Sequence, residues 1–312
     1  MEFETAVQVK RQLSSLLRID GVRIRSDRPR VALGFAPKAD SNEYQIALRA
    51  TSEAELARVL AKGVGDKVQA LTASEIDIRI TGPKKVGLPT EPVPLEPLRI
   101  GVSVGHYQTT AGTLGFFAQR IADGAIGIVS NNHVLAGCDR GKDGDDVLHP
   151  GAYDGGVRPL NVIGTLAGNF PRLNVAAPIV DCAFARLRDG VEYDPSTIAP
   201  GITLKPYPEP IGGQRIVMKR GRTTGLTEGR ITAIGLDNVD VEYPFGTVFL
   251  NQQIEIASTE RPFSKPGDSG SLIVDPEGNP IGLLAVGTFD CRLSYANPIS
   301  AVLSTLGVTF LT

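Results

Sequence analysis

The chain has 312 residues, of which 42% are hydrophobic and 21% charged, and these shares are typical of a soluble globular protein. Its net charge of −2 gives no reason to expect a nucleic-acid partner or a membrane surface. No apolar run approaches the roughly 20 residues that a membrane-spanning helix needs. The 35 glycines and 22 prolines indicate many turns and favour β-structure.

The cysteines and the N-terminus indicate where the protein works. There are three cysteines, Cys138, Cys182 and Cys291, in unrelated settings and without a CxxC pair. The first residues are acidic and lack the apolar stretch of a secretory signal. We therefore expect free thiols in a reducing compartment and a cytoplasmic protein.

Residues 1–82 predict a small α+β domain. Phe3, Val7 and Leu13 fall on one face of a first helix. Ser52 before Glu53 is typical of a helix N-cap and predicts a second helix. Alternating apolar residues predict short strands at 22–24, 31–35, 44–48 and 75–80.

A change of composition separates this domain from the rest. Residues 83–97 contain five prolines, which predicts an extended linker. From residue 98 to 312 short apolar runs alternate with turn residues, as in a sandwich or barrel. Apolar residues at helical spacing predict a closing helix at 298–306. The expected strands are 100–104, 114–118, 125–129, 162–166, 180–185, 216–219, 229–234, 239–241, 247–250, 253–256, 271–274 and 281–286.

Of the three histidines, His133 is the best candidate for a general base. It follows an apolar run at 125–129, so a buried strand would end in a short turn that holds the imidazole rigidly. A hydrogen-bonded structural histidine is the alternative. His106 ends another expected strand, and His149 precedes a proline in a polar loop.

A serine and an aspartate could complete a catalytic set. Ser269 lies between two glycines in Gly-Asp-Ser-Gly, which describes a tight turn that exposes its hydroxyl; an ordinary hairpin turn is the alternative. Asp181 begins an apolar strand, where a buried carboxylate needs a partner such as an imidazole N–H. A cap at the start of a strand is the plainer interpretation of this aspartate alone.

Together the three residues resemble the triad of trypsin-like (chymotrypsin-fold) serine peptidases. Their order is His, Asp, Ser, and Asn-His-Val-Leu, Val-Asp-Cys-Ala-Phe and Gly-Asp-Ser-Gly are similar to the three motifs of that family. The similarity covers residues 98–312. It implies a mainly β, chymotrypsin-like double β-barrel preceded by the small α+β domain. It also implies a serine endopeptidase that needs neither metal nor other cofactor and acts on protein or peptide substrates.

The resemblance assigns further residues. The backbone N–H groups of Gly267 and Ser269 would form the oxyanion hole. The segment Gly-Arg-Thr-Thr-Gly at 221–225 closely resembles one in α-lytic protease, which implies that Arg222 holds Asp268. Activation by cleavage after Arg99 is a weaker alternative.

Specificity is expected from the substrate pocket, for which the resemblance implies Phe263, Ala285, Val286, Gly287 and Ala296. None of these residues is acidic, so we do not expect cleavage after Lys or Arg. We expect instead a substrate with a small or apolar P1 side chain. The acidic loop at 139–146 lacks the spacing of an EF-hand and is interpreted as a solvated loop.

Residues 1–82 carry no recognisable chemistry, and we expect them to regulate the protease, to bind a regulatory partner or to assist folding. Two other functions compete. The barrel could be a catalytically silent scaffold that binds proteins, although all triad positions are filled. An esterase with the same triad is disfavoured, since the Gly-x-Ser-x-Gly elbow and the Ser-Asp-His order of α/β-hydrolases are absent.

Overall fold

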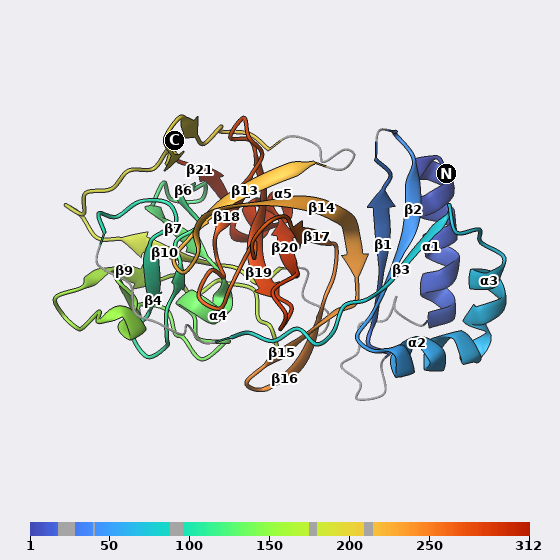
Figure 1. Cartoon of the computed structure of the whole chain (residues 1–312). Coiled ribbons are helices and arrows are strands. Elements are labelled where there is room, and N and C mark those ends of the chain that lie inside the picture. Colours follow the sequence, from blue (N-terminus) through green and yellow to red (C-terminus); the bar gives the residue numbers. More distant parts are fainter. Residues whose placement is uncertain (18–28, 40, 88–95, 175–179, 209–214) are drawn as a thin grey trace.

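Antiparallel strands dominate the chain from residue 98 onward and form two neighbouring units (Figure 1). The computed structural model describes residues 1–17, 29–39, 41–87, 96–174, 180–208 and 215–312. The strands are short and separated by glycine-rich turns, as the alternation of apolar runs and turn residues predicts.

The first unit is an open half-barrel, an eight-stranded sheet within the described ranges, in the order β21-β6-β7-β10-β9-β8-β4-β5. A short helix, α4 (Asn132–Leu135), follows β7 directly. A 3₁₀ turn at Ala152–Asp154 and a small β11–β12 pair (Thr197–Ala199 and Ile202–Thr203) complete the unit. The strands are β4 (Ser103–His106), β5 (Gly112–Thr113), β6 (Phe116–Arg120), β7 (Ile126–Ser130), β8 (Asp146–Leu148), β9 (Val162–Leu166), β10 (Ala183–Leu187) and β21 (Val308–Phe310).

The second unit is a closed barrel in the order β13-β18-β19-β20-β17-β14, and the pairing of β13 with β14 closes it. The predicted closing helix is confirmed as α5 (Ile299–Leu306). A separate hairpin, β15 (Val239–Tyr243) with β16 (Gly246–Leu250), leaves the barrel between β14 and β17. The barrel strands are β13 (Ile216–Gly221), β14 (Gly225–Asp237), β17 (Gln253–Ser258), β18 (Leu272–Val274), β19 (Pro280–Gly287) and β20 (Leu293–Pro298).

The N-terminal unit has the expected α+β elements, and its sheet continues the second barrel. Strand β1 pairs with the far half of β14 through Leu33–Asp237 and Phe35–Ile234, which sequence alone did not reveal. Ser52 caps α2 as predicted, through a bond from the Glu55 N–H. The predicted strand at 22–24 lies outside the described residues. The elements are α1 (Phe3–Leu17), β1 (Val31–Pro37), β2 (Tyr44–Ala50), α2 (Glu53–Val59) with a π-helical turn at Leu60–Val64, α3 (Gly65–Gln69) and β3 (Ile76–Ile80).

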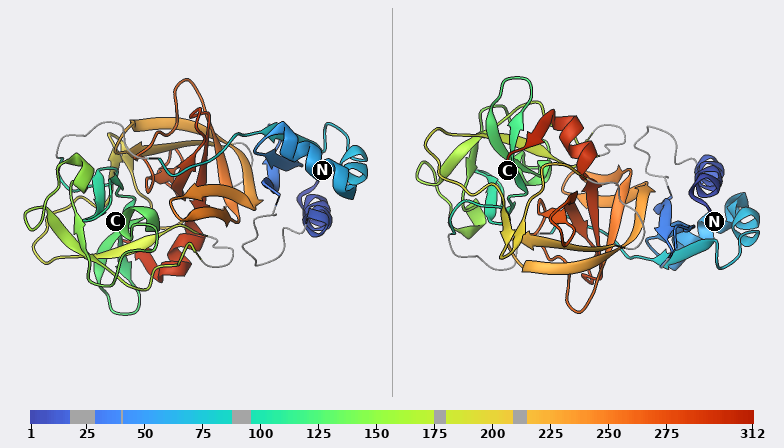
Figure 2. Two further views of the ribbon diagram at one scale, coloured as in Figure 1. Left: turned by 90° about the horizontal axis from the view of Figure 1, so that it is seen from below. Right: turned by 90° about the horizontal axis from the view of Figure 1, so that it is seen from above.

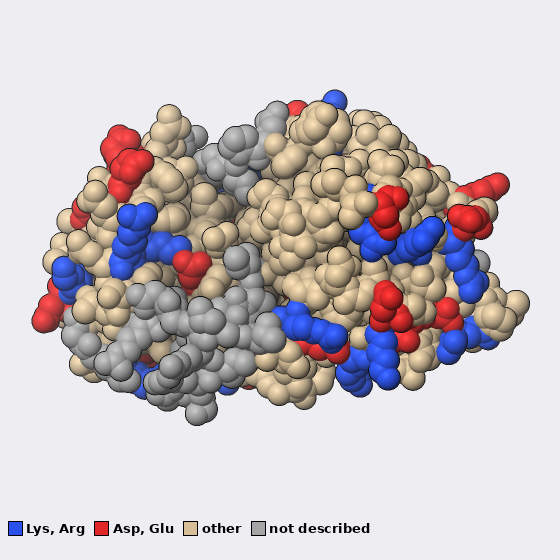
Figure 3. All heavy atoms as spheres, turned by 180° about the vertical axis from the view of Figure 1, so that it is seen from behind, with Lys and Arg blue, Asp and Glu red and all other residues tan. Residues whose placement is uncertain are grey.

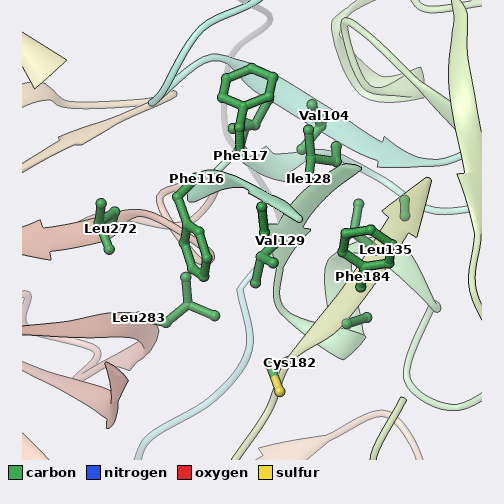
Figure 4. Close-up of a cluster of buried hydrophobic side chains, with 14 of the residues drawn as sticks. Val104, Phe116, Phe117, Ile128, Val129, Leu135, Cys182, Phe184, Leu272 and Leu283 are labelled. Carbon is green, nitrogen blue, oxygen red and sulfur yellow. The ribbon is translucent and has the colours of Figure 1, made fainter. Parts of the chain in front are cut away.

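The largest hydrophobic core lies in the first unit and reaches the second. Phe116 and Val129 of the half-barrel are fully buried in one cluster with Leu272 and Leu283 of the closed barrel (Figure 4). The two units therefore pack directly on each other through a shared core, which fixes their relative position.

The N-terminal unit lies beyond the second barrel, on the side away from the half-barrel, in all views (Figures 1 and 2). On the face shown in Figure 3, basic and acidic side chains lie interspersed, in keeping with the net charge of −2. No described helix is long and apolar enough to cross a membrane. Within the described part of the chain all three cysteines are free, as expected.

Candidate active site

His133 and Asp181 meet because β7 and β10 pair antiparallel, so that the residues just beyond the paired ends come together. His133 Nδ1 lies 2.6 Å from Asp181 Oδ2, and the His133 backbone N–H donates to Asp181 Oδ1 at 3.2 Å. Asp181 is fully buried and His133 is 9% exposed. A buried carboxylate on Nδ1 fixes the imidazole in the tautomer whose Nε2 can accept a proton.

Two asparagines clamp the backbone of Asp181. Asn131 Nδ2 donates to the Asp181 carbonyl at 2.7 Å. Asn297, on β20 of the second barrel, accepts from the Asp181 N–H at 3.0 Å and donates to its carbonyl at 3.1 Å. The aspartate is thus fixed from both barrels, a role that the sequence analysis did not assign to either asparagine.

Ser269 lies on a tight turn before β18. Gly267 and Gly270 have φ angles of +98° and +91°, which favour glycine. A Cβ on Gly270 would also lie 2.1 Å from Ser130 Oγ, so this position has no room for a side chain. Strand β5 of the first unit holds the turn, since the Thr113 N–H donates to the Ser269 carbonyl at 2.8 Å and Thr113 Oγ1 to the Gly267 carbonyl at 2.9 Å.

The turn that carries Ser269 and the helix α4, which carries His133, approach each other at Gly112. A Cβ built there would lie 2.4 Å from Val134, the residue after His133, and 3.1 Å from the Ser269 carbonyl oxygen. In the described part of the chain no hydrogen bond joins the Ser269 hydroxyl to the His133 ring. Such catalytic bonds are often long until substrate binds.

The backbone of the serine turn presents two free donors. Within the described residues, neither the Gly267 nor the Ser269 N–H has a protein acceptor. Their neighbours do, because Asp268 N–H binds the Lys265 carbonyl and Gly270 N–H the Leu284 carbonyl. Two unpaired N–H groups on one turn, next to a serine, have the chemistry of an oxyanion hole.

The predicted contact between Arg222 and Asp268 is wrong. Asp268 is fully buried, and its carboxylate accepts from the backbone of Thr223 at 2.8 Å and from Thr224 Oγ1 at 2.7 Å. Its cation is Lys219, whose Nζ lies 3.5 Å away. Arg222 instead forms a buried ion pair with Asp154 of the first unit.

Strand geometry explains why Lys219, and not Arg222, pairs with Asp268. Residues alternate along β13, so Val217, Lys219 and Gly221 face inward, whereas Arg222 lies beyond the strand end at the turn. Burial lowers the pKa of Lys219 to about 8, against the opposing attraction of Asp268, so the amine is still mostly protonated at neutral pH.

A cavity of about 540 Å³ opens beside Ser269. Val286 and Gly287 line it, as predicted from the resemblance. Its lining residues are Lys85, Val86, Gly87, Glu242, Pro244, Ser264, Lys265, Pro266, Ser269, Leu284, Val286, Gly287, Thr288, Phe289 and Cys291.

Phe263, Ala285 and Ala296 do not line this cavity. Phe263 and Ala296 are fully buried in the core of the second barrel, where an aromatic ring gains more from apolar contacts than from a solvent-filled pocket. The Ala285 side chain also points into a core cluster. Ser264, the residue after Phe263, lines the cavity instead, and its hydroxyl bonds to that of Ser294 at 2.7 Å.

The segment that joins the N-terminal unit to the two barrels borders the same cavity. We call residues 84–87 the strap. Lys84 forms an antiparallel bridge with Thr288, and Lys85 a parallel bridge with Glu242. Gly87 lies against Pro266, since a Cβ there would be 2.8 Å from the proline ring.

The remaining candidates have structural partners. His106 Nε2 lies 3.0 Å from Asp145, and His149 bonds to the carbonyls of Ser103 and Glu96. In the acidic loop, Asp139 accepts from the Leu173 and Asn174 N–H groups. Within the described ranges no group of three possible ligands could hold a metal ion.

Solved structures identify the fold. Protease A of Thermobifida fusca is 20% identical and superposes with a TM-score of 0.50, covering 70% of this chain and 100% of its own. The Nocardiopsis protease is 21% identical and superposes with a TM-score of 0.48, and the match covers 70% of this chain and 100% of that protease. This chain has the chymotrypsin-like double β-barrel fold, preceded by a small α+β unit. The predicted fold class is confirmed.

One family model, described as the Nal1 C-terminal domain, matches residues 201–296. The match contains Ser269 but neither His133 nor Asp181. No curated protein matches by sequence.

Proposed function

We propose that this protein is a serine endopeptidase in which Ser269 is the nucleophile, His133 the general base and Asp181 the residue that orients it. The observation that carries the proposal is the buried 2.6 Å pair of His133 and Asp181. The turn that carries Ser269, with two N–H groups that have no protein acceptor among the described residues, approaches the helix of His133 at Gly112. A silent scaffold has no need of an imidazole held by a buried carboxylate beside unpaired N–H groups.

The geometry supports the following reaction. Ser269 Oγ attacks the peptide carbonyl carbon while His133 Nε2 takes its proton, and the imidazolium donates through Nδ1 to Asp181. The Gly267 and Ser269 N–H groups bind the oxyanion. His133 then protonates the leaving amine as the C–N bond breaks, and water releases the acyl group by the reverse sequence.

Its test is labelling of the whole chain with a fluorophosphonate, together with digestion of a diverse peptide library read by mass spectrometry. We expect one phosphonate on Ser269, cleavage of peptides after small or apolar residues, and neither in Ser269→Ala. Ester turnover without peptide cleavage would show an esterase. An unlabelled, correctly folded chain would establish the scaffold function instead.

We also propose that the residues before the barrels regulate this site, and that the three free thiols reflect a cytoplasmic protein. The strap supports regulation. It runs antiparallel to the end of β19 beside Val286 and Gly287, in the relation expected for a substrate strand before its scissile bond. Lys84 anchors it, with Nζ 3.1 Å from the buried Asp240. A regulatory partner would act through residues 1–82.

Loosening the strap is expected to favour long substrates. Val86 packs against the cluster that contains Val286, so Val86→Gly removes an apolar contact and frees this edge. We expect kcat/KM for tetrapeptide substrates to rise about tenfold, the equivalent of 1.4 kcal/mol. A single-residue ester, which does not reach the strap, serves as the internal control. Equal changes for both substrates would contradict strap competition.

A further inference from the structure

The hairpin β15–β16 brings an unexpected side chain to the site. Tyr243, the last residue of β15, is 5% exposed, and its hydroxyl donates to Asp181 Oδ2 at 2.8 Å. Its ring meets the His133 ring edge-on, with centroids 6.1 Å apart, and stacks on Phe245 at 5.7 Å. The tyrosine therefore touches both members of the buried pair.

The carboxylate of Asp181 has three donors. Oδ1 accepts from the His133 backbone, and Oδ2 accepts from both His133 Nδ1 and the Tyr243 hydroxyl. A buried carboxylate is costly unless its oxygens are satisfied, and bonds to a charged acceptor are among the stronger ones. The Tyr243 hydroxyl therefore supplies Asp181 Oδ2 with a second donor, in addition to His133 Nδ1.

The other groups near Asp181 do not compete as donors or change charge at neutral pH. Burial first, and then the Asp181 charge, raise the pKa of Tyr243 well above its ordinary value, so the phenol stays protonated. The same two causes raise the pKa of Cys138, on the loop after α4, to about 12. Asp139 on that loop is bound to Asn132 and to backbone N–H groups. The remaining side chain in contact with Asp181 is the imidazole of His133.

We infer that Tyr243 is a positioning residue, which acts on His133 through Asp181. Its hydroxyl holds the carboxylate in the rotamer that faces Nδ1 and withdraws negative charge from Oδ2. This role rests on the proposed triad for its catalytic meaning, but its effect on the histidine does not require turnover. It also gives the β15–β16 hairpin a function that the barrel alone does not explain.

The sign of the effect follows from charge. Without the hydroxyl, Oδ2 keeps more negative charge, which favours the imidazolium, so the pKa of His133 should rise. The acid limb of kcat/KM against pH should then move upward by about half a unit, since such shifts follow the environment of the base. Loss of the fixed rotamer should lower the plateau of kcat by about tenfold.

The experiment is Tyr243→Phe in the whole chain, which keeps the ring and its stacking on Phe245. The titration of His133 is followed by NMR of the imidazole, and the pH profile by peptide hydrolysis. Tyr295→Phe is the matched control, because Tyr295 is a fully buried tyrosine that donates to a different carboxylate, Glu255, at 3.1 Å. We expect the His133 pKa to rise only in Tyr243→Phe.

An unchanged His133 titration in a folded Tyr243→Phe protein would overturn the inference, whatever its activity. A shift of equal size in Tyr295→Phe would do the same, since it would indicate a general effect of destabilisation. A shifted titration in a chain that never cleaves peptides would keep the positioning role and reject the proposed function. The two proposals are therefore separable.

Discussion

Ser269→Ala and His133→Ala are each expected to lower kcat for peptide hydrolysis by about 10⁶-fold, and the double variant no further. The reason is that the serine proton and the imidazole act in one step, so removing either partner removes the whole covalent route. Single-turnover assays with excess enzyme provide the sensitivity that such slow variants need.

The control for these variants is Ser300→Ala, an exposed serine at the start of α5, which should retain full activity. Circular dichroism should show all variants folded. If the losses in Ser269→Ala and His133→Ala multiplied in the double variant, the two residues would act independently. The proposed proton transfer from Ser269 to His133 would then be wrong.

His133, Asp181 and Ser269 could be singled out in the sequence because their signals are local. Each of its members lies next to an apolar strand, and a turn with glycines on both sides of Ser269 has few structural interpretations. The pattern of short strands predicted a sandwich or barrel, and the family resemblance of the three motifs implied the chymotrypsin-like double β-barrel. Residues whose roles depend on the neighbouring strand were harder to assign.

Lys219 shows what a closer analysis of alternation could have found. It stands between Val217 and Gly221 at the inward positions of β13, so a period of two already predicts its burial and its need for an anion. The resemblance of residues 221–225 to α-lytic protease implied Arg222 instead. Phe263 was misplaced for the same reason, because an apolar side chain at that position packs equally well into a core.

The contact between Tyr243 and Asp181 and the pairing of β1 with β14 could not be predicted from local sequence patterns. Tyr243 is 62 residues from Asp181 in sequence, and only the tertiary fold brings the β15–β16 hairpin to it. Strand β1 is buried at every position, which predicts a covered strand but does not name β14 as its partner. Pairing between distant strands is set by packing that one sequence does not display.

Arg49→Met is expected to lower the free energy of unfolding by about 3–5 kcal/mol, because it leaves a buried charge without its partner. Arg49 on β2 is 1% exposed and Glu255 on β17 is fully buried, and Arg49 Nε lies 2.9 Å from both Glu255 carboxylate oxygens. The guanidinium also binds Asp77 at 2.7 Å. Denaturation by urea, followed by fluorescence and circular dichroism, measures the change.

Arg79→Met is the matched control on the same ionic cluster. Arg79 is 38% exposed and lies 3.1 Å from Asp77 and 4.0 Å from Glu255, so solvent screens both pairs, and its loss should cost about 1 kcal/mol or less. Adding Glu255→Gln to Arg49→Met should recover part of the loss, since the orphaned charge disappears while Tyr295 and Thr232 still have an amide to bind. If Arg49→Met cost no more than Arg79→Met, the N-terminal unit would be a separable attachment. A large cost shows instead that residues 1–82 are part of the barrel that carries Ser269, so any regulation they exert acts through the strap and the shared sheet.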